Sequence, residues 1–350
     1  MNISDVDKNF KVETEIEREG LVFRNILSEP FSVYGVFREN DAWVRMPDAV
    51  AKEVSHGVHV LSKHTAGGRV RFVTDSPYIA IKAVQSGRPN MNHMPASGQA
   101  GFDLYAGAGK NPIYRKSFIP PSGCVNGFEG VYDIGRSEKK VYTINFPLYF
   151  NVKELYIGLK EGSLLEKAPE YAITTPFVYY GSSITQGGCA SRPGNAYQGL
   201  ISRKYDADFI NLGFSGGAKA EPAIAEYIAG LDMSLFVYDY DFNTPTVEHL
   251  EATHEKMFLR IRETHPDTPI VIMSRPIFTL TDNDKRYMVI KKTYDNAVAR
   301  GDKNVYYIPG YELMSICEAE GTVDGTHPTD LGFFAMANRL SEVIDKILEK

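Results

Sequence analysis

The spacing of short apolar segments changes near residue 170, and this change limits the folds that the 350-residue chain can adopt. Before that point, short segments rich in β-branched and aromatic residues alternate with clusters of Gly, Pro, Ser and Asn. Examples are Arg69–Thr74, Tyr78–Val84, Lys140–Phe146 and Glu154–Leu159. Short strands at such spacing, without long helical segments, are typical of an antiparallel sandwich or barrel. We therefore expect residues 1–170 to form an all-β domain.

After residue 170, apolar segments alternate with amphipathic ones. The expected strands are Pro176–Tyr180, Phe209–Leu212, Ser234–Tyr238, Pro269–Ser274 and Val305–Ile308. The expected helices are Ala196–Tyr205, Ala220–Ala229, Thr246–His265, Asp282–Arg300 and Asp330–Leu348. Strands that are apolar throughout, with helices between them, indicate a parallel sheet covered on both faces. Residues 171–350 are thus expected to form an α/β domain that binds its ligand at the carboxyl ends of the strands.

The charge and hydropathy of the sequence argue against several kinds of partner. The 38 basic and 44 acidic residues give a net charge of −6, and they form no basic stripe, so a nucleic-acid partner is not expected. No apolar run reaches the length of a membrane span. The first residues do not resemble a secretory signal. The three widely spaced cysteines fit a reducing compartment, and we expect a cytoplasmic protein. A homo-oligomer is left open.

The cysteines and histidines give no metal-binding pattern in the sequence. The three cysteines, Cys124, Cys189 and Cys317, lie far apart and form no C-x-x-C motif, so we expect free thiols rather than disulfides or a thiolate zinc site. His56 and His59 form an H-x-x-H pair without a third ligand nearby, and we interpret them as solvated strand positions. No metal and no cofactor are expected.

Four polar blocks follow the predicted strands or precede the last helix. The first, Gly181-Ser182-Ser183-Ile184-Thr185, follows the first strand of the α/β domain. A serine at this place exposes its hydroxyl to the crevice above the sheet, and the amides after it point toward the group that the oxygen attacks. The alternative is a serine that only caps the helix.

The second block, residues 211–217, is rich in glycine. Glycine amides at this place can serve as anion donors, although a glycine turn without a ligand would look the same. Gly213 to Gly217 also match the G-x-S-x-G nucleophile motif of α/β-hydrolases, so Ser215 is a rival nucleophile.

The third and fourth blocks supply an amide and an imidazole. Asn243, just after the third strand, could donate to an oxyanion, or it could close an Asx turn. Asp324 and His327 lie three residues apart before the last helix. A carboxylate at this spacing can accept a hydrogen bond from one ring nitrogen and leave the other free to take a proton from a serine.

Together the four blocks, over about residues 176–345, resemble the SGNH/GDSL hydrolase family. The Gly-Asp-Ser-Leu block of the family appears here as Gly181–Ile184, its oxyanion-glycine block as Asn211–Gly216, its Gly-x-Asn-Asp block as Asp241–Asn243, and its Asp-x-x-His block as Asp324 and His327. The resemblance implies a flavodoxin-like three-layer α/β/α domain. It also implies that Ser183 is the nucleophile, that His327 is the general base and that Asp324 orients the histidine. The oxyanion donors would be the amides of Ser183 and Gly216 and the side chain of Asn243.

Two residues depart from the usual family pattern, since Ser182 replaces an Asp and Asp241 replaces a Gly. The sequence resembles instead a divergent branch of the family, which has a Gly-Ser-Ser-Ile-Thr block followed by a loop like Ala190–Gly194. Members of this branch often carry an N-terminal β-sandwich, and Gly101–Tyr105 is similar to a segment of theirs. On this resemblance we prefer Ser183 to Ser215 as the nucleophile, because a nucleophilic Ser215 would leave Ser183 and Asn243 without a role.

The resemblance implies a serine esterase that removes small acyl groups, acetyl in particular, from carbohydrate or similar alcohol esters. A lipase or thioesterase with the same mechanism is one alternative, and a catalytically degenerate carbohydrate-binding protein is another. The expected partner is a small-molecule or oligosaccharide ester. Arg192 could contact a polar leaving group or form a salt bridge. Aromatic residues such as Trp43 could bind glycan, although the β domain is more simply read as a wall of the site.

Overall fold

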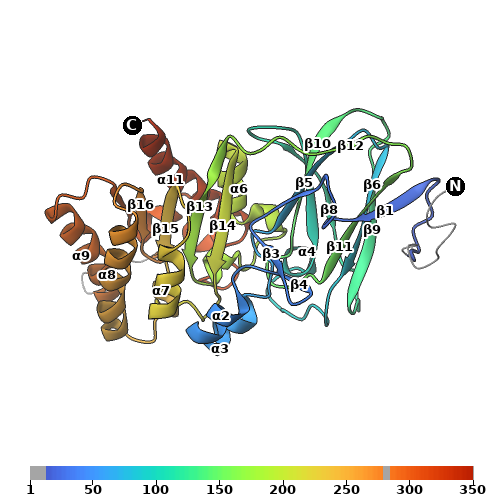
Figure 1. Cartoon of the computed structure of the whole chain (residues 1–350). Coiled ribbons are helices and arrows are strands. Elements are labelled where there is room, and N and C mark those ends of the chain that lie inside the picture. Colours follow the sequence, from blue (N-terminus) through green and yellow to red (C-terminus); the bar gives the residue numbers. More distant parts are fainter. Residues whose placement is uncertain (1–12, 279–283, 350) are drawn as a thin grey trace.

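The computed structural model describes residues 13–278 and 284–349 and shows two differently built halves side by side (Figure 1). The N-terminal half consists of two antiparallel sheets, which confirms the expected sandwich. The first sheet contains, in order, β1 (Leu21–Asn25), β11 (Glu154–Lys160), β6 (Tyr78–Val84) and β9 (Gly127–Asp133). The second contains β12 (Leu165–Glu166), β5 (Arg69–Thr74), β10 (Lys140–Asn145), β7 (Phe102–Ala106) and β8 (Ile113–Phe118), and β2 (Ser32–Tyr34) also pairs with β5.

The two sheets enclose one hydrophobic core, because alternate residues of each strand face inward. Val70 and Phe72 of β5 and Ile79 and Ile81 of β6 are fully buried in this core. Val73 belongs to a separate small cluster outside this core. Some of the β-branched and aromatic residues that predicted β5 and β6 from the sequence therefore occupy inward positions of the sandwich.

Short helices interrupt the β-rich half. The hairpin of β3 (Phe37–Glu39) and β4 (Ala42–Val44) leads into α2 (Asp48–Val54) and α3 (His56–Leu61), and α4 (Ala96–Gln99) follows later. Ala51, Val54 and Val58 of α2 and α3 are buried in a core of the α/β half. The interpretation of His56 and His59 as strand positions was wrong, since both lie on α3, where His59 Nε2 is 2.8 Å from Asp48 Oδ1.

The C-terminal half contains one parallel sheet with strand order β14-β13-β15-β16-β17, as expected for a flavodoxin-like domain. The strands are β13 (Ile173–Gly181), β14 (Ala207–Gly213), β15 (Leu235–Asp239), β16 (Ile270–Met273) and β17 (Val305–Ile308). The helices are α5 (Ser183–Gln186), α6 (Tyr197–Tyr205), α7 (Pro222–Ala229), α8 (Val247–Thr264), α9 (Lys285–Ala299), α10 (Gly310–Leu313) and α11 (Asp330–Leu348). Three 3₁₀ turns, η2 (Pro193–Asn195), η3 (Asp241–Asn243) and η4 (Glu318–Gly321), lie between them.

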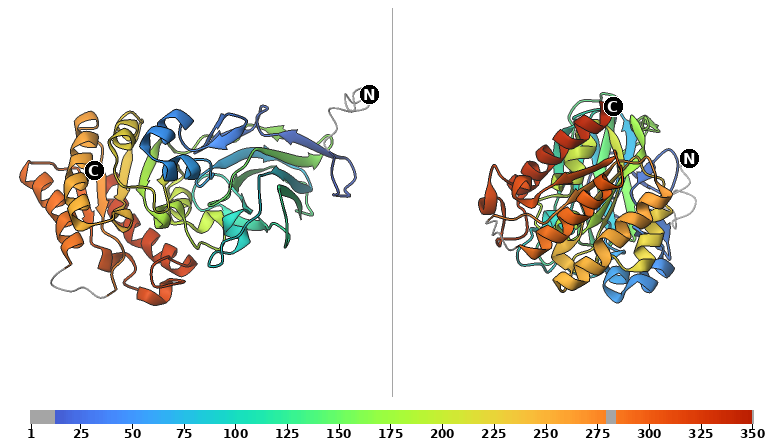
Figure 2. Two further views of the ribbon diagram at one scale, coloured as in Figure 1. Left: turned by 90° about the horizontal axis from the view of Figure 1, so that it is seen from below. Right: turned by 90° about the vertical axis from the view of Figure 1, so that its left-hand side faces the viewer.

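Helices cover both faces of the parallel sheet (Figure 2). Phe177 and Tyr179 of β13 pack with residues of α6 and α11, whereas Val178 and Tyr180 pack with residues of α2, α3, α7, α8 and α9. Because successive residues point to opposite faces, a strand buried on both sides must be apolar throughout. β14 lies on one side of β13, and the chain then crosses over to form β15 on the other side. The carboxyl end of β13 therefore lies at the topological switch point of the sheet.

Two buried arginines of the N-terminal half cover the free edge of β14. Arg69 Nη1 donates to the carbonyl of Phe209 at 3.1 Å, and Arg45 Nη1 donates to the carbonyls of Asn211 at 3.0 Å and Gly213 at 2.6 Å. These alternate carbonyls would pair with another strand if the sheet continued. Burial lowers the pKa of Arg45 to about 9, but this value still lies above neutral pH, so the guanidinium remains charged there.

Two further expectations concern the whole chain. Cys124, Cys189 and Cys317 are free thiols, as expected. Among residues 13–278 and 284–349, no helix is both long and apolar enough to cross a membrane.

Candidate active site

Ser182 and Ser183 divide the two functions that the sequence left open for one serine. Ser182 is the N-cap of α5, and its hydroxyl accepts a hydrogen bond from the amide of Ile184 at 3.2 Å. Ser183 is the first residue of the helix and leaves its hydroxyl free for another partner. Gly181 is required here, because a Cβ at this position would lie 1.9 Å from the carbonyl oxygen of Asp239. The short helix ends at Gly187, which has φ +100°.

Ser183, His327 and Asp324 form a continuous hydrogen-bonded chain. Ser183 Oγ is 2.9 Å from His327 Nε2, and His327 Nδ1 is 2.8 Å from Asp324 Oδ2. Burial alone would raise the pKa of Asp324, but hydrogen bonds from the backbone and ring of His327 and the amide of Thr326 lower it to about 2. The ionised carboxylate can only accept, so Nδ1 carries the proton and Nε2 accepts from the serine hydroxyl.

A tight turn between η4 and α11 holds the histidine. Asp324 Oδ1 accepts hydrogen bonds from the amides of Thr326 at 3.0 Å and His327 at 2.8 Å. The amide of Val323 in turn donates to the carbonyl of His327 at 2.9 Å. One carboxylate therefore fixes both the backbone and the ring of His327.

The loops that follow β14 and β15 meet beside the end of β13. The amide of Gly216 donates to Asn243 Oδ1 at 3.0 Å, and Asn243 Nδ2 donates to the carbonyl of Phe214 at 2.9 Å. These two bonds fix the orientation of the Asn243 amide. The structure thus brings Gly216 and Asn243 together, but it directs the amide of Gly216 at Asn243 rather than at the crevice.

Ser215, the rival nucleophile, has different partners from Ser183. Its amide donates to Gln186 Oε1 at 3.0 Å. Within residues 13–278 and 284–349, no histidine forms a hydrogen bond with its hydroxyl, whereas Ser183 bonds to His327. The geometry therefore favours Ser183 over Ser215.

The N-terminal half contributes to the site in a way that the sequence analysis missed. Tyr149 Oη donates to the carbonyl of Ser183 at 3.0 Å. Gln186 of α5 donates to the carbonyl of Leu148 at 3.1 Å, and its other side-chain atom accepts from Ser215. These contacts join α5 and the glycine loop to the β-sandwich. No spacing in the sequence signals them, because they arise only when the two halves pack together.

Arg192 lies at the boundary of the two halves. It donates to Tyr105 Oη at 2.8 Å and is 3.5 Å from Asp103 Oδ2. Asp103 is fully buried, and it also accepts hydrogen bonds from Asn145 Nδ2 at 2.7 Å and the amide of Gly194 at 2.8 Å. The structure thus gives Arg192 the salt bridge that was one of its two expected roles, and contact with substrate stays a prediction.

Trp43 is buried in the sandwich, with 4% of its surface exposed, and packs edge-on against Phe146. It therefore cannot stack on a glycan at the surface.

The sheet order and the serine just after the carboxyl end of β13, next to the edge strand β14, are typical of the SGNH class of hydrolases. Residues 174–345 match the GDSL-like lipase/acylhydrolase family, and residues 21–165 match the N-terminus of SGNH hydrolase-type esterases. The chain belongs to this family, in the branch that carries the additional N-terminal domain, and is a carboxylic ester hydrolase.

Solved structures of similar proteins agree with this assignment. A protein of Bacteroides ovatus described as a GDSL-like lipase is 29% identical with a TM-score of 0.83, and the match covers 94% of this chain and 98% of that one. A salicylyl-acyltransferase of a tetracycline biosynthetic pathway is 20% identical with a TM-score of 0.77, covering 95% and 98%. A family two carbohydrate esterase of Clostridium thermocellum, solved in complex with cellohexaose, is 14% identical with a TM-score of 0.59, covering 81% and 93%. The last two share the fold. A search of curated proteins gave no match.

Proposed function

We propose that the protein is a serine esterase that removes small acyl groups, acetyl in particular, from carbohydrate or similar alcohol esters. The observation that carries this proposal is the hydrogen-bonded chain from Ser183 through His327 to Asp324. A hydroxyl beside a neutral imidazole, with the other ring nitrogen bonded to a carboxylate, is the arrangement that activates a serine for acyl transfer.

In this mechanism Ser183 Oγ attacks the ester carbonyl while His327 Nε2 takes its proton. His327 then gives the proton to the leaving alcohol, and water, activated by the same nitrogen, releases the acid and restores the serine. The amide of Ser183, in the first turn of α5, and the remaining N–H of Asn243 Nδ2 stabilise the oxyanion. Gly216 can join them only when its amide leaves Asn243 Oδ1.

Two features of the site support a polar substrate with a short acyl group. The side chains of His327 and Asp324 are 24% and 40% exposed, so the leaving-group side is open to solvent and to a large polar alcohol. Beside the nucleophile the space is narrow, since a Cβ on Gly188 would lie 3.0 Å from Tyr149 Oη and 3.4 Å from His327 Cδ2. The fold shared with carbohydrate esterases supports the same class of substrate.

The test measures kcat and KM on p-nitrophenyl acetate, butyrate and octanoate, and acetate release from acetylated xylo-oligosaccharides. We expect the acetate ester to be preferred and Ser183→Ala to lower kcat by at least about 10³-fold. Ser215→Ala is the matched control and should retain activity.

A preference for octanoate would replace the proposal with a lipase or thioesterase. Binding of oligosaccharide without hydrolysis of any ester would replace it with a carbohydrate-binding protein.

A further inference from the structure

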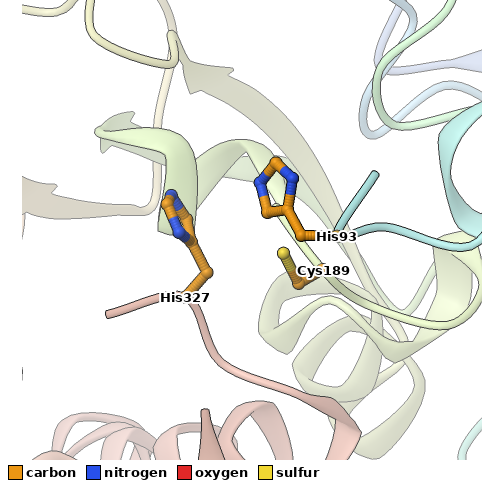
Figure 3. A group of neighbouring side chains, drawn as sticks. All are labelled: His93, Cys189 and His327. Atoms are coloured by element: carbon orange, nitrogen blue, oxygen red, sulfur yellow. The ribbon is translucent and has the colours of Figure 1, made fainter. Parts of the chain in front are cut away.

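A group of metal-binding side chains lies against His327 (Figure 3). His93 comes from the loop between β6 and α4, Cys189 from the loop after α5, and His327 from the turn before α11. One ligand atom from each residue lies within 4.8 Å of the other two. Figure 3 shows the sulfur of Cys189 close to the ring of His93, with the ring of His327 to the left of them.

The structure anchors the backbone of this group and leaves one side chain free to adjust. Met94, next to His93, is buried in the core of the α/β half, and Ser97 Oγ donates to the carbonyl of Ser191 at 2.6 Å. The His93 side chain itself is exposed, and its ring centre lies 5.6 Å from that of His327. The loop that carries His93 is therefore fixed on the α/β half while its imidazole can rotate.

Cys189 adopts a backbone conformation that is uncommon for its residue type. Its φ is +74°, in the left-handed region that favours glycine, and its side chain is buried. A side chain kept at such a position despite the cost is frequent at functional sites. Cys189 is part of the buried core of the α/β half, and its thiol at the edge of this core lies within 4.8 Å of a ring nitrogen of each histidine.

Two imidazoles and one thiol are the ligand set of zinc and similar ions, not of calcium or magnesium. Bond lengths of about 2.0 Å to nitrogen and 2.3 Å to sulfur, in tetrahedral geometry, separate ligand atoms by about 3.3–3.6 Å. Adjustments of roughly one ångström would bring the three ligand atoms to these distances. Rotation of the exposed His93 side chain can supply its part, and small shifts of Cys189 and His327 supply the rest.

We propose that His93, Cys189 and His327 bind a divalent transition-metal ion of the zinc class and that the bound ion inhibits the esterase. On binding, the Cys189 thiol loses its proton to solvent, and His327 Nε2 donates its lone pair to the metal. The same lone pair accepts the Ser183 proton in catalysis, so the nucleophile loses its base. The inhibition rests on the proposed function, whereas the binding does not.

Binding is tested with Co²⁺ as the probe, by the thiolate-to-cobalt charge-transfer absorption of the full-length protein. We expect the band in the wild type and in Ser183→Ala, which keeps all three ligands. Cys189→Ala should lose the band, and His93→Ala should weaken the affinity at least about 10-fold. His56→Ala is the matched control, because His56 and His59 on α3 form another histidine pair. Absence of the band from the wild type, or its persistence in Cys189→Ala, would overturn the site.

Inhibition is tested by titrating Zn²⁺ into the hydrolysis of p-nitrophenyl acetate. His93→Ala and Cys189→Ala should retain basal activity within about threefold and need at least about 10-fold more zinc for half-inhibition. His56→Ala should behave as the wild type. Equal inhibition of the wild type and His93→Ala, or activation by zinc, would overturn the proposal. If Ser183→Ala were as active as the wild type, the proposed function would be wrong. The cobalt experiment would still decide whether the metal site exists, because it does not depend on esterase activity.

Discussion

Tyr149 of the N-terminal half donates a hydrogen bond to the carbonyl of Ser183, at 3.0 Å. Burial raises the pKa of Tyr149, so its hydroxyl remains a donor at any working pH. Tyr149→Phe keeps the ring and removes this bond, which is worth about 0.5–1.5 kcal/mol. We expect kcat to fall about 2- to 10-fold with a nearly unchanged KM. An unchanged kcat would show that the N-terminal half does not position the nucleophile.

Asp324→Asn should lower kcat by about 10²–10⁴-fold without unfolding the protein. The Asn side chain keeps an oxygen for the amides of Thr326 and His327. However, its NH₂ group would face His327 Nδ1 and favour the tautomer with the proton on Nε2, which cannot accept from Ser183. Steady-state kinetics check the prediction, and a thermal melt checks the fold. A loss of less than threefold would contradict the assigned role of Asp324.

Asn243→Ala should lower kcat by about 10²–10³-fold, the effect of removing one oxyanion donor. The change also frees the amide of Gly216, which now bonds to Asn243 Oδ1. If the freed amide replaces the lost donor, the decrease will be smaller. A change in KM alone would mean that Asn243 binds the ground state of the substrate and not the oxyanion.

Asp103→Ala should destabilise the protein by about 3–5 kcal/mol, because it leaves buried donors of Asn145, Gly194 and Arg192 without an acceptor. Asp133→Ala is the control, since it breaks an exposed pair with Arg18 that solvent screens and that contributes little to stability. Chemical denaturation measures both. Equal effects would show that the buried cluster does not hold the two halves together.

The titration of Asp239 should make the free energy of unfolding fall as the pH rises. Burial, and then the charge of Asp241, raise the pKa of Asp239 to about 8, whereas the unfolded chain releases this proton near pH 4. Between these values the native state holds the additional proton, so the contribution of Asp239 to stability falls as pH rises from about 4 to 8.

Asp239→Asn removes this dependence. Relative to the wild type, the free energy of unfolding of the variant should rise between pH 5 and pH 8 in urea denaturation. Asp41→Asn, at an exposed turn, should show the same difference at both pH values. A constant difference for Asp239→Asn would contradict the prediction.

The sequence predicted those parts of the fold that depend on local periodicity. The bounds of β5, β6 and β17 agree with the expected segments, and α6 begins one residue after its predicted start. α2 and α3 were missed because both are short and rich in valine. The signal of α2 was the three-residue spacing of Ala51 and Val54, which places both on one side of that helix. They pack against the α/β core together with Val58 of α3.

The residues of the site likewise include some that the sequence could predict and some that it could not. The four blocks could be found because parallel strands bring their carboxyl ends to one edge, so that Ser183, Gly216 and Asn243 had to be neighbours. Tyr149 and His93 could not be found, because they reach Ser183 and His327 through the packing of two halves that no local spacing encodes.

The arginine contacts along β14 make the catalytic half dependent on its neighbour for solubility as well as for shape. A truncated protein that starts at residue 171 would present the carbonyls of Phe209, Asn211 and Gly213 to water and to other copies of itself. An exposed strand edge with unpaired carbonyls can pair with the same edge of another molecule. The smallest unit that protects this edge should therefore be the complete pair of halves, in which guanidinium groups lie where a sixth strand would otherwise pair.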